Sequence, residues 1–119
     1  MNKGISIIIP LFNEAEGIPV LVKSLNDFFE NKHETSIEII FVNDGSTDDS
    51  FNILQKQKFV NYSVQLISFS KNFGSHAALR AGILYAKMEF ITFMYADLQD
   101  PLELIPLMYE KAITGFDIV

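Results

Sequence analysis

Four short polar segments carry the residues whose types could do chemistry, and each follows an apolar run. The segments are Leu11-Phe12-Asn13-Glu14, Asn43-Asp44-Gly45-Ser46, Ser70-Lys71-Asn72-Phe73-Gly74 and Asp97-Leu98-Gln99-Asp100. Carboxylate and amide oxygens are the ligands that Mg²⁺ and Mn²⁺ prefer, and these cations usually share such ligands with substrate phosphates. If the fold brings the four segments together, they would suit a phosphate-containing ligand that is bridged by a metal ion.

The last of these segments is the candidate cation site. Asp97 and Gln99 supply two hard oxygen ligands within three residues. Asp97 has apolar neighbours, and the sequence offers a helix cap elsewhere, so we interpret it as a ligand and not as a structural residue. Asp100 precedes Pro101, a position typical of a helix N-cap, and this favours a structural role for Asp100.

The first two segments offer candidate ligands for a nucleoside, and each candidate has a structural alternative. Asp44 could accept hydrogen bonds from a base or a ribose, or it could close an Asx-turn. Glu14 could instead complement a helix dipole, and Asn13 could be an ordinary turn residue. Ser46 or Thr47 could cap a helix.

Arg80, Phe12 and Phe73 are further candidates. Arg80 could pair with a phosphate or with one of the carboxylates, or it could be a solvated surface charge. Phe12 and Phe73 each follow a predicted strand and could line a pocket, whereas the other phenylalanines mostly fit core positions.

The two common phosphate-binding loops are absent from this sequence. The segment after the first strand lacks the G-x-G-x-x-G run of a Rossmann dinucleotide site, and no G-x-x-x-x-G-K-[ST] motif occurs. A bound nucleotide must therefore have its phosphates neutralised in another way. A divalent cation is the natural candidate.

The elements that must position these segments alternate along the chain. Short β-branched or apolar runs predict strands over Ile5–Pro10, Ile37–Val42, Val64–Phe69 and Phe90–Tyr95. Apolar spacings of three and four predict helices over Glu14–Phe29, from Ser46 or Thr47 to Gln55, over Ser75–Lys87, and from Pro101 onward. On the third helix, Ala78, Leu79, Gly82, Ile83 and Ala86 are expected to face inward. Such alternation predicts an α/β fold with a mainly parallel sheet, helices on both faces and ligands beyond the carboxyl ends of the strands.

Composition excludes several classes of protein. The chain has 119 residues, 49% of them hydrophobic, which is enough for the core of one domain. Its 15 acidic and 9 basic residues give a net charge of −6 without a basic stripe, which argues against nucleic-acid binding. The absence of cysteine excludes disulfides, thiolate metal sites and a cysteine nucleophile. The last residues read as a turn followed by the start of a strand, so we expect a truncated domain.

The motifs taken in series resemble family 2 glycosyltransferases of GT-A fold. The resemblance is carried by Pro10-Leu11-Phe12-Asn13-Glu14, Val42-Asn43-Asp44-Gly45-Ser46-Thr47-Asp48, Asn72-Phe73-Gly74 and Ala96-Asp97-Leu98-Gln99-Asp100-Pro101. It covers nearly the whole chain, residues 1–119. The Asp-Leu-Gln-Asp-Pro form is most similar to the polyprenyl-phosphate glycosyltransferases, which include the dolichol-phosphate mannose synthase group.

The resemblance implies an enzyme that moves a sugar from a UDP- or GDP-linked donor to an acceptor, with inversion at the anomeric carbon. It implies that Pro10, Phe12, Asn13, Glu14, Asp44, Ser46, Arg80 and Asp97 bind the nucleotide-sugar. It also implies that Asp97 and Gln99 hold Mg²⁺ or Mn²⁺ with the donor diphosphate. In this subgroup the acceptor is a polyprenyl phosphate at the cytoplasmic face of the cell membrane, reached through segments outside this chain.

Two departures and three rival interpretations accompany this resemblance. Many relatives carry an aspartate where this chain has Tyr95, so one potential metal ligand is missing. The catalytic residues are expected beyond Val119.

The rivals are a family 2 enzyme that acts on a cell-surface polysaccharide, a response-regulator receiver domain and a non-catalytic binding module. The receiver fits poorly, because Asn13-Glu14 and Ser70-Lys71 stand where its acidic pair and phosphorylated aspartate belong. Exposed sheet edges could lead to an oligomer.

Overall fold

The protein alternates strands and helices in the order predicted from its sequence. The structure is a computed structural model that describes residues 2–30, 36–97, 102, 105 and 110. The elements are β1 (Asn2–Leu11), α1 (Ile18–Phe28), β2 (Ile37–Asn43), α2 (Ser50–Gln55), β3 (Ser63–Ser68), α3 (Ser75–Tyr85) and β4 (Met88–Phe93). The predicted helix beginning at Pro101 lies outside the described residues.

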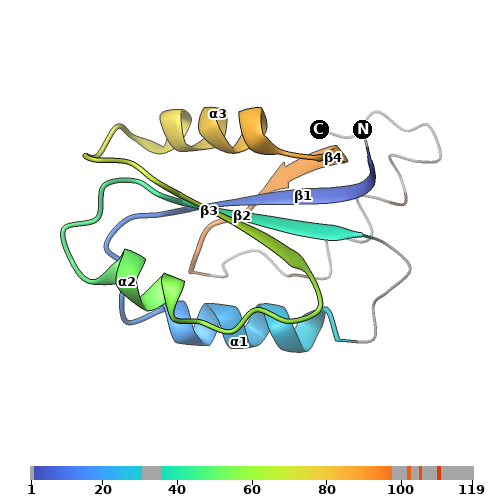
Figure 1. The fold of residues 1–119 in the computed structure, drawn as a ribbon, viewed down its shortest axis with the longest axis horizontal. Helices are drawn as coiled ribbons and strands as arrows, with labels where there is room; N and C mark the ends of the chain where they lie inside the picture. Colours follow the sequence, from blue (N-terminus) through green and yellow to red (C-terminus); the bar gives the residue numbers. More distant parts are fainter. Residues whose placement is uncertain (1, 31–35, 98–101, 103–104, 106–109, 111–119) are drawn as a thin grey trace.

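The strands form one parallel sheet in the order β3-β2-β1-β4 (Figure 1). β1 pairs with β2 so that Ile7 lies opposite Ile39, and it pairs with β4 so that Ile8 lies opposite Phe93. The predicted parallel sheet is therefore confirmed. Because all four strands run in the same direction, their carboxyl ends reach the same edge of the sheet. We call this edge the rim.

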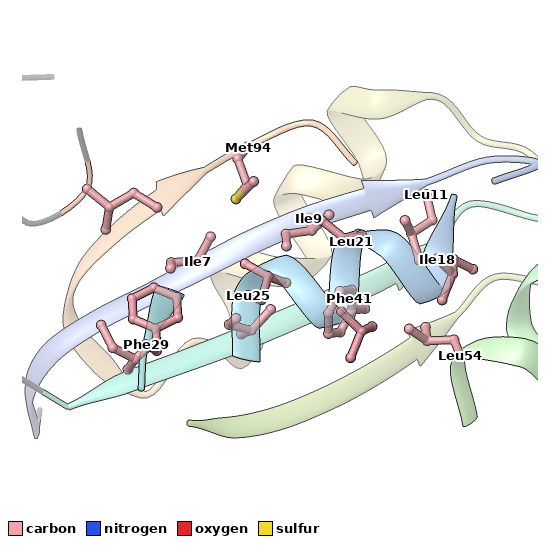
Figure 2. Close-up of a cluster of buried hydrophobic side chains, with 14 of the residues drawn as sticks. Ile7, Ile9, Leu11, Ile18, Leu21, Leu25, Phe29, Phe41, Leu54 and Met94 are labelled. Atoms are coloured by element: carbon pink, nitrogen blue, oxygen red, sulfur yellow. The ribbon is translucent and has the colours of Figure 1, made fainter. Parts of the chain in front are cut away.

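One face of the sheet carries the main core. Alternate residues of β1 point toward α1, and they meet the apolar stripe of that helix and the aromatic ring of Phe41 from β2 (Figure 2). The fully buried members of this cluster include Ile7, Ile9, Leu11, Ile18, Leu21, Leu25, Phe41 and Leu54. Burying side chains of this size stabilises the fold by about 1.5–3 kcal/mol each. This core fixes β1, and hence the residues that follow it, against α1.

The opposite face of the sheet is covered by α3 (Figure 1), so the prediction of helices on both faces is confirmed. The contact is close because α3 presents small residues to the sheet. A Cβ atom at Gly82 would lie 2.5 Å from Cγ2 of Ile8. The expectation that Ile83 faces inward is wrong, since its side chain is 55% exposed. The small pair Ala78 and Gly82, four residues apart, sets the contact line, and Ile83 lies about 100° around the helix from Gly82.

The first two helices begin later than the sequence pattern predicts. α1 starts at Ile18 and not at Glu14, because Gly17 is its N-cap and Pro19 occupies its first turn. α2 has Asp49 at its N-cap, so the prediction that Ser46 or Thr47 caps this helix is wrong. Both residues are instead hydrogen-bonded to Asn13.

A buried carboxylate lies beneath α3, away from the rim. Glu38 of β2 is 2% exposed. Its side chain accepts hydrogen bonds from the hydroxyl of Ser6 at 2.7 Å, the side-chain amide of Gln65 at 2.8 Å and the backbone N–H of Lys87 at 3.0 Å. The Gln65 amide also donates to the carbonyl of Tyr85, the last residue of α3. Glu38 thus fastens the connection between α3 and β4 to the sheet.

In the described ranges, no helix is both long enough and apolar enough to cross a bilayer.

Candidate functional site

The loop after β1 is tied to the loop after β2 by the side chain of Asn13. Its backbone has a φ of 53°, a left-handed conformation that asparagine adopts more readily than most residues. Its Oδ1 accepts hydrogen bonds from the backbone N–H groups of Thr47 at 2.8 Å and Asp48 at 3.3 Å. Its own N–H donates to Oγ of Ser46 at 3.0 Å, and that hydroxyl donates to Oδ1 of Asn43. The structure therefore brings together the predicted site residues Asn13 and Ser46.

A second tie between the same loops runs through Asp48 and Ser50. The backbone N–H of Glu14 donates to Oγ of Ser50 at 2.9 Å, and that of Ala15 donates to Oδ2 of Asp48 at 3.3 Å. Asp48 also accepts hydrogen bonds from the hydroxyl and the backbone N–H of Ser50. The Ser50 hydroxyl is the main reason that the pKa of Asp48 lies below its ordinary value. The carboxylate form of Asp48 therefore supports the tie.

Asp44 connects the loop after β2 to the loop after β3. The residue is only 4% exposed. Its Oδ1 accepts a hydrogen bond from the N–H of Phe73 at 2.8 Å. Its Oδ2 accepts one from the N–H of Gly74 at 3.0 Å and one from the side-chain amide of Asn72 at 3.2 Å. The structure thus places Asp44 at the rim with its carboxylate directed into the neighbouring loop.

Gly45 lets these two loops touch. Its φ is 66°, and a Cβ atom there would lie 2.1 Å from the carbonyl carbon of Lys71 and 2.3 Å from the backbone nitrogen of Asn72. Real Cβ atoms do not approach other atoms this closely. Only glycine fits between the loops, so the backbone of the third loop lies directly on the second.

Exposed aromatic rings lie in the loop after β1 and in the loop after β3. Phe12 is 45% exposed and Phe73 is 54% exposed. The Phe73 ring packs edge-to-face on Phe69, and the ammonium group of Lys71 lies 5.1 Å from its centroid. Pro10 lies near the end of β1, where the pairing with β4 has already stopped at Ile8, so its missing N–H costs no ladder hydrogen bond.

The β4 end of the rim is described only as far as Asp97. This residue lies in the turn after β4 and is exposed. Gln99 and Asp100 fall outside the described residues. Of the two predicted metal ligands, Asp97 and Gln99, the structure therefore describes only Asp97. No group of three histidine, aspartate or glutamate side chains within metal-binding reach occurs in the parts of the chain that the structure describes. Arg80 is exposed on α3.

Sequence reasoning did not single out three residues that build this site. Asp48 and Asn72 were named there only as members of longer segments, and Ser50 was not named at all. The available signal was the density of Asp, Asn and Ser after β2 and β3, because these residues often bond to nearby backbone groups. That signal does not say whether such bonds stay within a loop or cross to another one.

Comparison with known proteins now gives the family. The sequence profile of glycosyl transferase family 2 matches residues 6–119. The chain belongs to glycosyl transferase family 2. The resemblance drawn from the motifs is thereby confirmed, and the receiver-domain rival is set aside.

The curated relatives of this family 2 chain are longer proteins. It is 41% identical over 115 residues to the prophage bactoprenol glucosyl transferase homolog of Escherichia coli strain K12, a match that covers 97% of this chain and 37% of that protein. It is 34% identical to the undecaprenyl-phosphate 4-deoxy-4-formamido-L-arabinose transferase of Salmonella choleraesuis strain SC-B67, covering 98% of this chain and 36% of that protein. The chain thus spans little more than a third of the relatives it matches.

A solved structure confirms the fold of the family 2 chain. The crystal structure of S. aureus TarS 1-349 in complex with UDP-GlcNAc superposes with a TM-score of 0.70 at 19% identity, covering 98% of this chain and 37% of that one. The predicted GT-A fold is therefore confirmed. The tied loops at the rim stand where parallel α/β sheets bind ligands.

Proposed function

We propose that the full-length protein transfers a sugar from a nucleotide-sugar donor to a polyprenyl phosphate, with inversion at the anomeric carbon. The observation that carries the proposal is the set of hydrogen bonds between the loops at the rim. They bring three of the four motif segments together at the carboxyl edge of a family 2 sheet. The names of the curated relatives support a polyprenyl-phosphate acceptor. The reaction would take place at the cytoplasmic face of the cell membrane.

The nucleoside of the donor is assigned to the loops after β1 and β2. Asn13, Glu14 and Ser46 would surround it, with Pro10 and Phe12 beneath. Support comes from the fixed geometry of these loops, since the left-handed Asn13 and its hydrogen bonds to Thr47 and Asp48 hold the loop before any ligand arrives. A preformed site spends less of its binding free energy on ordering itself.

Asp97 and Gln99 are assigned to a Mg²⁺ or Mn²⁺ ion and the donor diphosphate, and Arg80 to one of the phosphates. The exposed carboxylate of Asp97 at the rim fits this role, because Mg²⁺ is usually held by one or two carboxylates together with phosphate oxygens and waters. A bound cation would neutralise the charge that the leaving nucleoside diphosphate gains. Tyr95 at the preceding motif position supplies no carboxylate, so Asp97 becomes the main protein ligand.

The acceptor end of the reaction is assigned to the remainder of the full-length protein, together with the catalytic group. A lipid phosphate is already anionic and needs little deprotonation before it attacks the anomeric carbon. The demand on the enzyme is therefore to position the donor and to stabilise the leaving group. The hydrogen-bonded loops at the rim of this chain serve to position the donor.

The test uses the full-length protein in membranes or detergent. Radiolabelled UDP-glucose, UDP-GlcNAc and GDP-mannose are each supplied with undecaprenyl phosphate, with and without Mn²⁺. We expect one donor to put label into an organic-extractable lipid in the presence of metal. Asp97→Ala should lower this transfer at least about 100-fold, since removing one charge-stabilising group typically costs that much. Asp27→Ala is the matched control, because Asp27 is an exposed carboxylate on α1 that pairs with Lys23.

Three outcomes would count against parts of the proposal. Label that appears only in soluble glycan would favour the polysaccharide rival. Binding of a donor without turnover would favour a non-catalytic module. Transfer that Asp97→Ala leaves unchanged would remove Asp97 from the metal site.

A further inference from the structure

The helix α3 is apolar on its outer side, although it already buries another side against the sheet. Ala78 and Gly82 face the sheet. Away from the sheet, Leu84 is 76% exposed, and its neighbours Ile83 and Tyr85 are more than half exposed. A helix that is apolar on both sides is expected to be covered on both. We define the outer face of α3 as the exposed residues His76, Arg80, Ile83, Leu84 and Tyr85.

The helix on the other face of the sheet has a polar exterior. The exposed residues of α1 include Lys23 and Asp27, whose side chains form an ion pair at 2.7 Å. Val20 is a single exposed apolar residue at the start of that helix. An apolar exterior is therefore a particular property of α3 and not a general one of the helices in this protein.

The charge around α3 is positive in a chain whose net charge is −6. Residues 50–88 contain five of the nine basic residues and none of the 15 acidic ones. Three of these basic residues accompany α3, and all three are exposed: Lys71 before it, Arg80 on it and Lys87 after it. They are too far apart to form a basic stripe. With no acid among them, they nevertheless favour a partner whose surface is negatively charged.

Three acidic residues adjoin this helix, and two of them are hidden from solvent. Asp44 and Glu38 lie at its two ends, but each is at most 4% exposed and accepts hydrogen bonds from backbone N–H groups. Glu89 is exposed on β4, beyond the connection that follows α3. The charge that the described residues next to α3 present to solvent is therefore mainly positive.

An anionic bilayer surface suits this face better than a second protein does. Basic residues combined with protruding leucine, isoleucine and tyrosine side chains are typical of helices that lie among lipid headgroups. A stable protein interface takes about 800 Å² and about 20–30 residues from each partner, and α3 has only 11 residues. The polyprenyl-phosphate acceptor proposed above also lies in a bilayer.

We propose that the outer face of α3 lies on an anionic lipid surface, with Leu84 and Tyr85 among the headgroups. The inference rests on the proposed function in one respect, since that function brings the protein to a membrane. α3 begins next to the rim and runs along the sheet (Figure 1), so this contact keeps the rim beside the bilayer that holds the acceptor. The contact orients the domain and does not anchor it, because each basic residue near such a surface raises partitioning only about fivefold.

The first experiment locates α3 relative to the bilayer in the full-length protein. The protein is placed in nanodiscs of phosphatidylcholine and phosphatidylglycerol that carry spin-labelled headgroups, and Leu84→Cys receives an NBD label. Residues 1–119 contain no cysteine, and any cysteine beyond them is replaced first. Quenching should be at least about threefold stronger than in Val20→Cys, because Val20 is exposed on the opposite face of the sheet. Equal quenching at the two positions would overturn the proposal.

The second experiment tests the part played by charge. Quenching at position 84 should fall at least about twofold in discs of phosphatidylcholine alone and at high salt, because salt screens exposed charges. Lys87→Gln should weaken quenching in the mixed discs, whereas Lys23→Gln on α1 should not. Arg80 stays unchanged throughout, because it is assigned above to a donor phosphate. A label that is shielded from water but not quenched would show that protein covers the face, and the proposal would be wrong.

The third experiment uses activity with two forms of the acceptor. Leu84→Glu places a carboxylate against the lipid phosphates and should raise the KM for undecaprenyl phosphate about fivefold in vesicles that contain phosphatidylglycerol. The KM for the donor and for a water-soluble short-chain polyprenyl phosphate should not change. Val20→Glu is the matched control and should alter none of the three values. A raised KM for the soluble acceptor would place Leu84 in the acceptor site and overturn the proposal.

The outcomes separate this inference from the proposed function. If the wild-type protein transfers no sugar, the proposed function fails, and quenching at position 84 still decides whether α3 meets lipid. If sugar is transferred but position 84 is quenched no more than position 20, only the lipid contact fails. Circular dichroism shows whether each variant folds. If Leu84→Glu does not fold, the quenching of labelled Leu84→Cys and its response to Lys87→Gln carry the test.

Discussion

At the scale of single residues, the site is built from side chains that bond to the backbone of a neighbouring loop. Asn13 reaches the loop after β2, and Asp44 reaches the loop after β3. Each bond crosses between segments about 30 residues apart in the sequence. The loops therefore hold one another at the rim, and the loss of one side chain affects two loops.

Two substitutions at Asn13 separate its two contributions. Asn13→Gly removes the acceptor for the N–H groups of Thr47 and Asp48 but keeps the left-handed backbone, and it should lower the free energy of unfolding by about 1 kcal/mol. Asn13→Ala loses the same acceptor and also strains the backbone, which should cost about 1 kcal/mol more. Urea unfolding at neutral pH measures both. Equal stability of the two variants would show that the backbone conformation contributes nothing.

The residue types of the site could be predicted, but the partners of several could not. Asp44 and Asn13 were predicted from their place after apolar runs, and the structure brings both to the rim. The partners lie in other loops, because Ser46 and Thr47 bond to Asn13 and do not cap a helix. A helix cap and a cross-loop bond require the same residue types, so sequence pattern cannot separate them.

At the scale of elements, Glu38 joins three strands and the end of a helix. Burial raises the pKa of this carboxyl group, but hydrogen bonds from the Lys87 N–H, the Ser6 hydroxyl and the Gln65 amide, together with the Lys87 charge, outweigh burial. The pKa of folded Glu38 therefore lies below its ordinary value of about 4.3. Ionised Glu38 stabilises the fold above that pH, and this contribution is lost as the pH falls through the lower folded pKa.

The pH dependence of stability tests this role of Glu38. Glu38→Gln should be less stable than the wild type at pH 7, and the gap in free energy of unfolding should narrow as the pH falls below about 4.3, because the wild type then loses its ionised carboxylate. Urea unfolding at a series of pH values gives the curve. Glu16→Gln, at an exposed position before α1, should leave the shape of the curve unchanged. A gap for Glu38→Gln that stays constant as the solution is acidified would contradict the assignment.

The strands were predictable to within three residues at either end, whereas the starts of two helices were not. β-Branched runs between polar segments leave little choice for β1 and β2. The start of α1 depends on Gly17 and Pro19, and the start of α2 depends on Asp49. Both starts follow polar segments that offer several residues able to begin a helix. Burial of Glu38 was also missed, although a lone acid between Ile37 and Ile39 in an apolar run is its visible signal.

At the scale of the whole molecule, apolar side chains remain exposed along β4 and the turn after it. Ile91, Phe93 and Tyr95 are 39%, 51% and 51% exposed, and the rings of Phe93 and Tyr95 pack edge-to-face. Leu84 and Tyr85 at the end of α3 are also exposed. β4 is the outer strand of the sheet in the described part of the chain. Exposed apolar groups beside an outer strand favour association.

The 119-residue chain expressed alone should therefore associate with itself. Sedimentation velocity over a range of protein concentrations should show a shift from monomer to larger species in the micromolar range. Phe93→Ser should reduce this shift, because it removes an exposed aromatic side chain from β4. Val20→Ser is the control, since Val20 is 64% exposed on α1. A chain that stays monomeric at all concentrations would contradict the prediction.

The central place of β1 has a consequence for synthesis of the protein. One edge of β1 pairs with β2, but its other edge pairs with β4, and the bond from the Met88 N–H to the Ser6 hydroxyl joins residues 82 positions apart. While the chain emerges from the ribosome, the first strand made must wait for the last one described. A long isoleucine-rich strand is left open on one side during that interval, which makes the nascent chain a client for chaperones.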